Sequence, residues 1–450
     1  MHIKFIYRNC ILCEERKLIK FNKKRYIGLK FMVILLCCIC IINRVTVCFA
    51  DDEDEIDDVE ETIEWNELEN DINEVSNNLT VEPTLNSRRC IVYDRTTKMV
   101  IYGKNEELKS AMASTTKIMT AIIVLENTEN LNKVVTITQK AAGTGGSRLG
   151  LKKDDKISIY DLLYGLMLRS GNDAAVALAI EVGGSVEGFA ELMNAKAEEL
   201  GLTNTHFVTP HGLDNNEHYT TAYELAKLTD YALENKEFAK IVGTKNYTIT
   251  INGYSKALNN TNELLGTLDG VVGVKTGFTN NAGRCLVTET KRGDTDIITV
   301  VLGADTKKYR TKDSIKLIEY AFSNFTKVNI KEKAEVEFEN WKAININRIN
   351  LIKSKKNSME ITLSEFEKIE IPVRKDKVDL IEYNINVITQ MEAPIEQNTK
   401  IGTLTIKLED DIIESIDIIC SKTVERKTWW DYFKENLVKC RTISQFLYEF

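Results

Sequence analysis

A hydroxyl and an amine stand three residues apart near the start of an apolar run in this 450-residue chain, as Ser114 and Lys117. On a helix, side chains at this spacing share one face, so the two groups would lie within reach of each other. A serine hydroxyl is a weak nucleophile until a nearby base takes its proton, and a neutral lysine can be that base. The pair therefore predicts nucleophilic catalysis by Ser114.

The residues that follow Lys117 predict a buried central helix. Burial disfavours a charged amine and lowers a lysine pKa, as a catalytic base requires. The start of such a helix also carries partial positive charge, which favours an oxyanion forming at Ser114. The apolar positions are Ile118, Met119, Ala121, Ile122, Ile123, Val124 and Leu125.

Two further motifs give this short pattern its weight, because Ser-x-x-Lys alone recurs by chance. Ser170-Gly171-Asn172 follows an apolar run at 162–168, and Lys275-Thr276-Gly277 follows a predicted strand at 271–274. Penicillin-binding proteins and serine β-lactamases carry three such motifs in the same order. The chain resembles one group of them, the serine-type D-alanyl-D-alanine carboxypeptidases or low-molecular-mass penicillin-binding proteins.

This resemblance covers residues from about 89 to 321 and includes the stretches 209–213, 218–222 and 275–279. It implies an α/β (α+β) fold, a β-lactamase/transpeptidase-like catalytic domain with an antiparallel sheet flanked by helices. We place this domain at residues 86–326. Helices are expected at 158–168, 173–182 and 224–233, and strands at 90–93, 99–102, 284–288 and 297–302.

The resemblance also implies a reaction and a set of site residues. The enzyme would remove the terminal D-alanine of peptidoglycan stem pentapeptides through an acyl-enzyme, and β-lactam antibiotics would acylate it. The backbone N–H groups of Ser114 and Phe278 would hold the oxyanion. Catalysis is expected from Ser114, Lys117, Ser170 and Asn172, and substrate binding from Lys275, Thr276, Gly277 and Phe278.

Three other functions remain open at this point. A β-lactamase of related fold would carry Ser-Asp-Asn and a glutamate-held water, whereas Gly171 stands in the middle motif and the stretch around Glu191 resembles the glutamate loop only faintly. A D,D-endopeptidase and a non-catalytic wall-binding protein are the second and third. Ser170 and Asp173 could also simply cap the following helix.

No metal, cofactor or nucleic acid is expected. His206, His211 and His218 lie close together, but Pro210 and Gly212 break the helix that zinc ligands at i and i+4 would need. A net charge of −8 gives no sign of a nucleic-acid partner.

Residues 1–50 are typical of a secretory signal peptide, with a basic segment, an apolar run at 31–42 and the small Ala50. This predicts export to the outer face of the cytoplasmic membrane or the cell-wall space. An uncleaved anchor is the alternative, although a membrane span needs about 20 apolar residues. Residues 51–85 are expected to form an acidic, disordered linker.

The last part of the chain changes in character. Short alternating runs at 336–338, 359–363, 368–373, 381–388, 401–406 and 412–419 predict a small all-β domain at 330–421 without catalytic residues. Residues 424–450 mix aromatic and basic side chains, such as Trp429, Trp430 and Lys434. They predict an amphipathic helix on a membrane surface, with docking on the protein's own core as the alternative. Four cysteines lie beyond residue 50 at scattered positions, so a disulfide framework is not expected.

Overall fold

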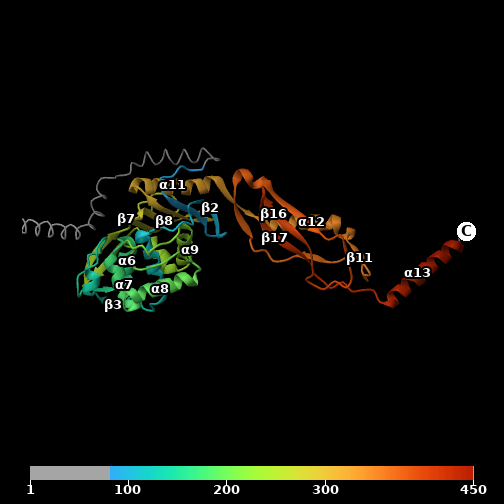
Figure 1. Cartoon of the computed structure of the whole chain (residues 1–450), viewed down its shortest axis with the longest axis horizontal. Coiled ribbons are helices and arrows are strands. Elements are labelled where there is room, and N and C mark those ends of the chain that lie inside the picture. The colour runs from blue at the N-terminus through green and yellow to red at the C-terminus, as the bar shows by residue number, and fades with distance from the viewer. Residues whose placement is uncertain (1–81, 449–450) are drawn as a thin grey trace, which may run out of the picture. The chain divides into compact units, whose positions relative to one another are not determined.

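The computed structural model describes residues 82–448, and it describes side chains as far as Lys439. The expected signal peptide at 1–50 and most of the expected linker at 51–85 lie outside the described residues. Figure 1 shows the labelled helices and strands.

A five-stranded antiparallel sheet forms the centre of the catalytic domain, in the order β2-β1-β9-β8-β7. The hairpin predicted near residue 90 and the two later predicted strands are present in it. Strand β7 lies at one edge, so one of its sides is open to other groups. The strands are β1 (Arg89–Asp94), β2 (Met99–Lys104), β7 (Val271–Thr279), β8 (Gly283–Arg292) and β9 (Thr295–Ala304).

Helices cover both faces of this sheet (Figure 1). Along β1, Cys90 and Val92 pack against residues of α11 (Lys307–Asn324), whereas Ile91 and Tyr93 belong to the larger core with the other helices. This alternation follows from the period of two along a strand. The larger core holds α4 (Lys117–Glu126), α6 (Ile159–Leu168), α7 (Asn172–Gly183), α8 (Val186–Glu199), α9 (Ala222–Leu233) and α10 (Lys236–Val242).

Side-chain caps fix where several of these helices begin. Ser158, Ser185 and Thr221 precede α6, α8 and α9, and each side chain accepts a hydrogen bond from the backbone N–H three residues later. Such caps satisfy N–H groups that have no partner within the helix. The helices predicted at 158–168, 173–182 and 224–233 correspond to α6, α7 and α9, and each starts within one or two residues of the expected position.

The C-terminal domain is rich in strands and has an apolar core. Its largest sheet has four strands in the order β12-β17-β16-β14, and Leu404 and Ile416 lie at its buried centre. The strands are β10 (Phe325–Asn329), β11 (Asn350–Ile352), β12 (Ile361–Leu363), β13 (Glu370–Arg374), β14 (Ile381–Val387), β15 (Gln390–Glu392), β16 (Lys400–Leu408) and β17 (Asp411–Cys420).

One predicted strand of this domain is wrong. Residues 336–338 lie within the helix α12 (Ile330–Asn345), so the domain is β-rich and not all-β. Ile330, Ala334 and Phe338 are the buried residues of α12, at the spacing of one helical face. The side chain of Asn329 caps the helix by accepting from Glu332 N. The three-residue run was too short to distinguish the two periods.

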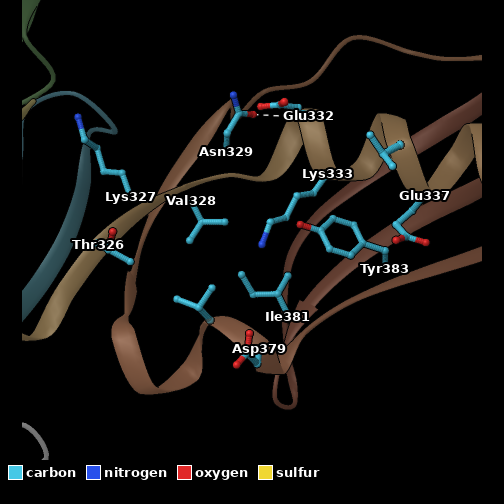
Figure 2. A pocket seen from close by; sticks show the side chains of 12 residues that line it. Thr326, Lys327, Val328, Asn329, Glu332, Lys333, Glu337, Asp379, Ile381 and Tyr383 are labelled. Carbon is cyan, nitrogen blue, oxygen red and sulfur yellow. Dashed lines mark hydrogen bonds between the residues drawn. The ribbon is translucent and has the colours of Figure 1, made fainter.

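A cavity of about 800 Å³ lies in the C-terminal domain, between β10, α12 and the start of β14. Figure 2 shows Lys333 and Glu337 of α12 near Tyr383 of β14 at this cavity. No predicted site residue lines this cavity; all of them belong to the catalytic domain.

The chain ends in the helix α13 (Trp429–Tyr448). Within the described part of the chain, no helix combines the length and the apolar character that a membrane span requires. Cys90, Cys285 and Cys420 are buried free thiols.

Candidate active site

Ser114 lies in a short 3₁₀ turn, Ala113–Thr116, that leads directly into α4. In a 3₁₀ turn, side chains three residues apart lie almost one above the other. Lys117, the first residue of α4, accordingly places its Nζ 2.8 Å from Ser114 Oγ. Ser114 is partly exposed, whereas the Lys117 side chain is fully buried. The hydroxyl is therefore open to a substrate and the amine is shielded from water.

Lys117 joins the nucleophile turn to a second wall of the site. Its Nζ also donates to Asn172 Oδ1 at 2.7 Å and to the backbone oxygen of His211 at 3.0 Å. Asn172 is the first residue of α7, and only 2% of its side chain is exposed. The Ser-x-x-Lys and Ser-Gly-Asn motifs, 55 residues apart, thus meet at one amine.

Ser170 occupies the turn between α6 and α7 in a strained backbone conformation. Its φ angle is +56°, in the left-handed region that residues other than glycine rarely adopt. The residue is buried, and its Oγ has no hydrogen-bond partner among residues 82–448. Strain and an unpaired buried hydroxyl are each costly and tend to persist at functional sites. Ser170 Oγ is therefore available to a substrate.

Asp173 stabilises the loop beside this turn. Its carboxylate accepts hydrogen bonds from the N–H groups of Leu149, Gly150 and Leu151 at 2.8, 2.8 and 2.9 Å. The cap position of α7 is Gly171 and has no side-chain bond. The interpretation that Ser170 caps α7 is therefore wrong, because Ser170 lies one residue too early. Asp173, in the first turn of α7, accepts from Ala174 N at 2.9 Å in addition to binding the neighbouring loop.

Strand β7 forms the third wall and passes close to the nucleophile. A Cβ atom on Gly277 would lie 3.0 Å from Ser114 N and 3.2 Å from Thr115 N. A larger residue would push the strand away, which explains the glycine of Lys-Thr-Gly. Lys275 and Gly277 share one face of β7 because they are two residues apart. The Lys275 side of the strand thus faces the turn that carries Ser114.

Lys275 is buried, and its surroundings favour the neutral form of its amine over the charged form. Only 1% of the side chain is exposed, and Nζ donates to the backbone oxygen of Thr276 at 2.8 Å. Burial, together with the nearby Arg310 guanidinium, lowers the pKa of Lys275 to about 7. A group with such a pKa changes its charge near neutral pH, which links binding of an anion to pH.

Arg310 belongs to none of the three sequence motifs, yet it lies near Lys275. It lies in α11, is 4% exposed, and donates to Glu263 Oε1 at 3.0 Å. Desolvation lowers its pKa, and Glu263 opposes this effect. Arg310 falls on the same helical face as the buried Leu317 and Ala321. A charged residue on an apolar face was the signal in the sequence that could have revealed it.

Thr276 and Phe278 lie on the opposite face of β7 from Lys275. The Oγ1 atoms of Thr276 and Thr261 are 2.7 Å apart. The Phe278 ring stacks with Arg284, whose guanidinium carbon lies 3.8 Å from the ring centroid. The ring of Phe278 is thus directed to the neighbouring strand β8, and only its backbone could serve an oxyanion at Ser114.

A loop containing two of the predicted histidines packs on the nucleophile turn. Gly212 has a φ angle of +87°, and a Cβ there would lie 1.9 Å from the backbone oxygen of Ala113. Thr120 Oγ1 of α4 donates to the backbone oxygen of Pro210 at 2.6 Å. These contacts place His211 O where it accepts from Lys117.

His218 has a similar supporting position. Its Nδ1 accepts from Val208 N at 3.0 Å, so the ring proton lies on Nε2 and is directed to Thr116 Oγ1, 2.7 Å away. Burial lowers the pKa of His218 to about 4 and that of His211 to about 3, which keeps both rings neutral at pH 7. Among the residues that the structure describes, no group of three or more metal-binding side chains comes together.

Glu191, in the stretch with a faint resemblance to the β-lactamase glutamate loop, is exposed on α8. A water for fast deacylation has to be held beside the acylated serine. An exposed side chain on a helix surface provides no such sheltered position.

Comparisons with known proteins agree with this geometry. Residues 76–306 match the family described as D-alanyl-D-alanine carboxypeptidase, and residues 342–426 match the C-terminal domain of penicillin-binding protein 5. The chain is 31% identical to the D-alanyl-D-alanine carboxypeptidase DacF of Bacillus subtilis, covering 80% of this chain and 91% of that protein. It is 33% identical to DacC of Escherichia coli, covering 78% and 89%.

Solved structures show the same relationship. The D-alanyl-D-alanine carboxypeptidase DacD from Francisella tularensis matches with a TM-score of 0.66 and 29% identity, over 77% of this chain and 95% of that one. The Streptomyces K15 DD-transpeptidase matches with a TM-score of 0.53 and 35% identity, over 54% of this chain and all of its own. Because the matches extend through both domains, the chain belongs to the D-alanyl-D-alanine carboxypeptidases, the low-molecular-mass penicillin-binding proteins, and is a serine-type hydrolase.

Proposed function

We propose that Ser114 performs the carboxypeptidase reaction of this protein on peptidoglycan stem pentapeptides that end in D-Ala-D-Ala. The observation that carries this proposal is the 2.8 Å contact between Ser114 Oγ and the buried Lys117 Nζ. A partly exposed hydroxyl next to a buried amine is the arrangement that an activated serine nucleophile needs.

In the acylation step, Ser114 Oγ attacks the carbonyl carbon between the two D-alanines while its proton passes to a neutral Lys117 Nζ. The backbone N–H groups of Ser114 and Phe278 stabilise the negative charge on the carbonyl oxygen. The close approach of Gly277 to Ser114 N supports this pairing, because it brings β7 to the nucleophile turn. The C–N bond then breaks, and the leaving amine takes a proton through Ser170 Oγ and Lys117.

The far end of the substrate needs a positive surface. Lys275 and Thr276 bind the terminal carboxylate, and the buried Arg310 adds positive charge behind them. Asn172 bonds the substrate amide. Water later releases the acyl group from Ser114. β-Lactam antibiotics resemble the terminal dipeptide and acylate the same hydroxyl.

The test is release of D-alanine from a tripeptide that ends in D-Ala-D-Ala. Ser114→Ala removes the nucleophile, so kcat should fall by more than ~10³-fold. Ser255→Ala is the matched control, because Ser255 is an exposed serine of β6 (Tyr254–Asn259) and should leave kcat unchanged. Turnover by Ser114→Ala at the rate of the unaltered enzyme would remove Ser114 from this role.

The same enzyme acts, in this proposal, on the outer face of the cytoplasmic membrane, with α13 lying on the membrane surface. Trp429 and Trp430 at its start are 67% and 61% exposed. Trp429 stacks with Phe433 one turn later, at 5.4 Å between ring centroids. Exposed aromatic side chains on one helix, next to the basic Lys427 and Lys434, suit the interface between headgroups and acyl chains.

A further inference from the structure

A short segment at 260–263 contacts several walls of the active site. Thr261 N donates to the backbone oxygen of Leu168, the last residue of α6, at 3.1 Å. Asn262, 3% exposed, donates through Nδ2 to the backbone oxygen of Gly273 in β7 at 2.9 Å. Glu263 accepts from Arg310. The segment thus connects the turn of Ser170, the strand of Lys275 and helix α11.

Thr261 also contacts a predicted substrate-binding side chain directly. Its Oγ1 lies 2.7 Å from Thr276 Oγ1, and in the described part of the chain it is the only hydrogen-bond partner of the Thr276 hydroxyl. Thr276 is 8% exposed, so its hydroxyl is held in a largely buried position with little access to water. The direction of the hydrogen bond between Thr261 and Thr276 therefore decides whether the Thr276 hydroxyl can donate its proton to a substrate.

The pair can share a hydrogen bond in two ways. If Thr276 donates to Thr261, its single proton is used and cannot reach a carboxylate. If Thr261 donates to Thr276, the proton of Thr276 remains free. A carboxylate only accepts hydrogen bonds. A substrate that ends in a carboxylate is therefore compatible only with the second arrangement.

We propose that Thr261 is a positioning residue that donates to Thr276 Oγ1 and thereby directs the Thr276 hydroxyl proton to the terminal carboxylate of the substrate. This inference rests on the proposed role of Thr276 in binding that carboxylate. Through its backbone N–H, Thr261 also fixes the distance between β7 and the Ser170 turn. Thr261 thus contributes to selectivity for peptides with a free carboxyl end.

The test is a double-mutant cycle between Thr261 and Thr276, with kcat and KM measured on a tripeptide ending in D-Ala-D-Ala. Thr261→Val keeps the volume and removes the hydroxyl. It should raise KM about tenfold and change kcat less than threefold, because a hydrogen bond to a charged group is affected. Thr261→Ser keeps the hydroxyl and should restore KM to within about twofold of the unaltered enzyme.

The double-mutant cycle distinguishes an effect on the orientation of the Thr276 hydroxyl from an effect on the packing around Thr261. In the Thr276→Val background no hydroxyl is left to orient, so adding Thr261→Val should change KM by less than twofold. An equal KM increase in both backgrounds, or none in either, would overturn the proposal, because the first outcome is what a packing defect produces. Thr244→Val is the matched control, since the Thr244 hydroxyl donates to Lys240 O and not to β7.

Circular dichroism and the Tm show whether each variant is folded. If Thr261→Val is not folded, Thr261→Ala is used in its place, with the same expected pattern across the two backgrounds. The unaltered enzyme provides the separate test of the proposed function. Absence of D-alanine release from it would reject that function, whereas normal turnover with an additive cycle would reject only the role of Thr261.

Discussion

In the catalytic domain, Lys117 and Lys275 are 0% and 1% exposed, and Asp173 and Arg310 are also buried. In the C-terminal domain, the core around Leu404 is apolar. Among described residues beyond 329, the only buried polar side chains are Ser354 and Glu414. Both domains combine strands with helices, so the type of fold does not explain the contrast.

The difference shows that the energetic cost of burying charged groups falls mainly on the catalytic domain. A buried charge loses its hydration and is retained only when it is paired or has a function. Some buried charges of the catalytic domain lie next to Ser114, as Lys117 does, others hold neighbouring loops, as Asp173 does for residues 149–151, and others are paired, as Glu289 is with Arg95. The C-terminal domain buries fewer such groups: Glu414 of β17 accepts from Glu367 N at 2.7 Å, and most of the buried core around it is apolar. Substitutions in the two domains should therefore have different consequences.

Replacing the buried lysine of the nucleophile turn should have the largest effect on turnover. Lys117→Met keeps the length of the side chain but removes the base, and kcat should fall by ~10²- to 10⁴-fold. Lys353→Met is the control from the C-terminal domain, where Lys353 forms a surface pair with Glu392 at 2.7 Å. Its kcat should match that of the unaltered enzyme. Similar losses in both variants would remove the contrast between the domains.

The next effect concerns pH. The proposed binding of the substrate carboxylate by Lys275 requires the charged form of the amine, and the pKa of Lys275 is lowered to about 7. KM for a tripeptide ending in D-Ala-D-Ala should therefore rise as the pH passes upward through about 7. Arg310→Leu removes a neighbouring positive charge, so it should move this rise to higher pH. A KM that is constant from pH 6 to 9, or a shift in the opposite direction, would contradict the role of Lys275.

The same pKa predicts a change in stability. Between about 7 and the ordinary lysine value of 10.5, the unfolded chain holds a proton on Lys275 that the folded chain lacks. Folded stability should therefore increase with pH across this window. Lys275→Met should raise the Tm most at pH 6, and the gain should shrink toward pH 10. Lys353→Met should show no such trend, since Lys353 is exposed.

A core substitution in the C-terminal domain should affect stability and leave catalysis intact. Leu404 is 0% exposed, so Leu404→Ala should lower the unfolding free energy of this domain by ~2–5 kcal/mol. At temperatures where both domains are folded, kcat/KM on a soluble tripeptide should change less than twofold. A tenfold loss would show that the C-terminal core supports the active site.

The smallest effect on turnover is expected from α13. Replacing Trp429 and Trp430 together by alanine should weaken binding to anionic lipid vesicles about tenfold or more, because the burial of large apolar side chains is lost. Activity on a soluble tripeptide should not change. Leu380→Ala is the control, since Leu380 is a 48% exposed apolar residue outside the helix. Equal vesicle binding by all three proteins would argue against the membrane surface as partner.

The spacing of residues along the chain predicted much of the candidate site, but it could not predict contacts between residues that are far apart in the sequence. The spacing of three residues from Ser114 to Lys117 was enough to predict their contact, since one helical turn determines it. The partners of these residues come from elsewhere in the fold. Arg310 and Thr261 belong to no recognisable motif. Their contacts with Glu263 and Thr276 join separate elements of the fold, which spacing along the chain does not reveal.

In the C-terminal domain, sequence patterns predicted the longer strands but not the helix. Its strands at 381–388, 401–406 and 412–419 were predicted well because they alternate over six or more residues. The helix at Ile330–Asn345 was missed, because its buried positions are separated by charged residues and its mean character is polar. Only the spacing of Ile330, Ala334 and Phe338 indicated a helix.

The most direct test of the central claim is the mass of the enzyme after reaction with benzylpenicillin. The claim predicts one added penicilloyl group, located by fragmentation at Ser114 within the tryptic peptide 110–117, and no addition to Ser114→Ala. A folded protein that gains no mass, or that carries the group on another residue while releasing D-alanine, would contradict the account.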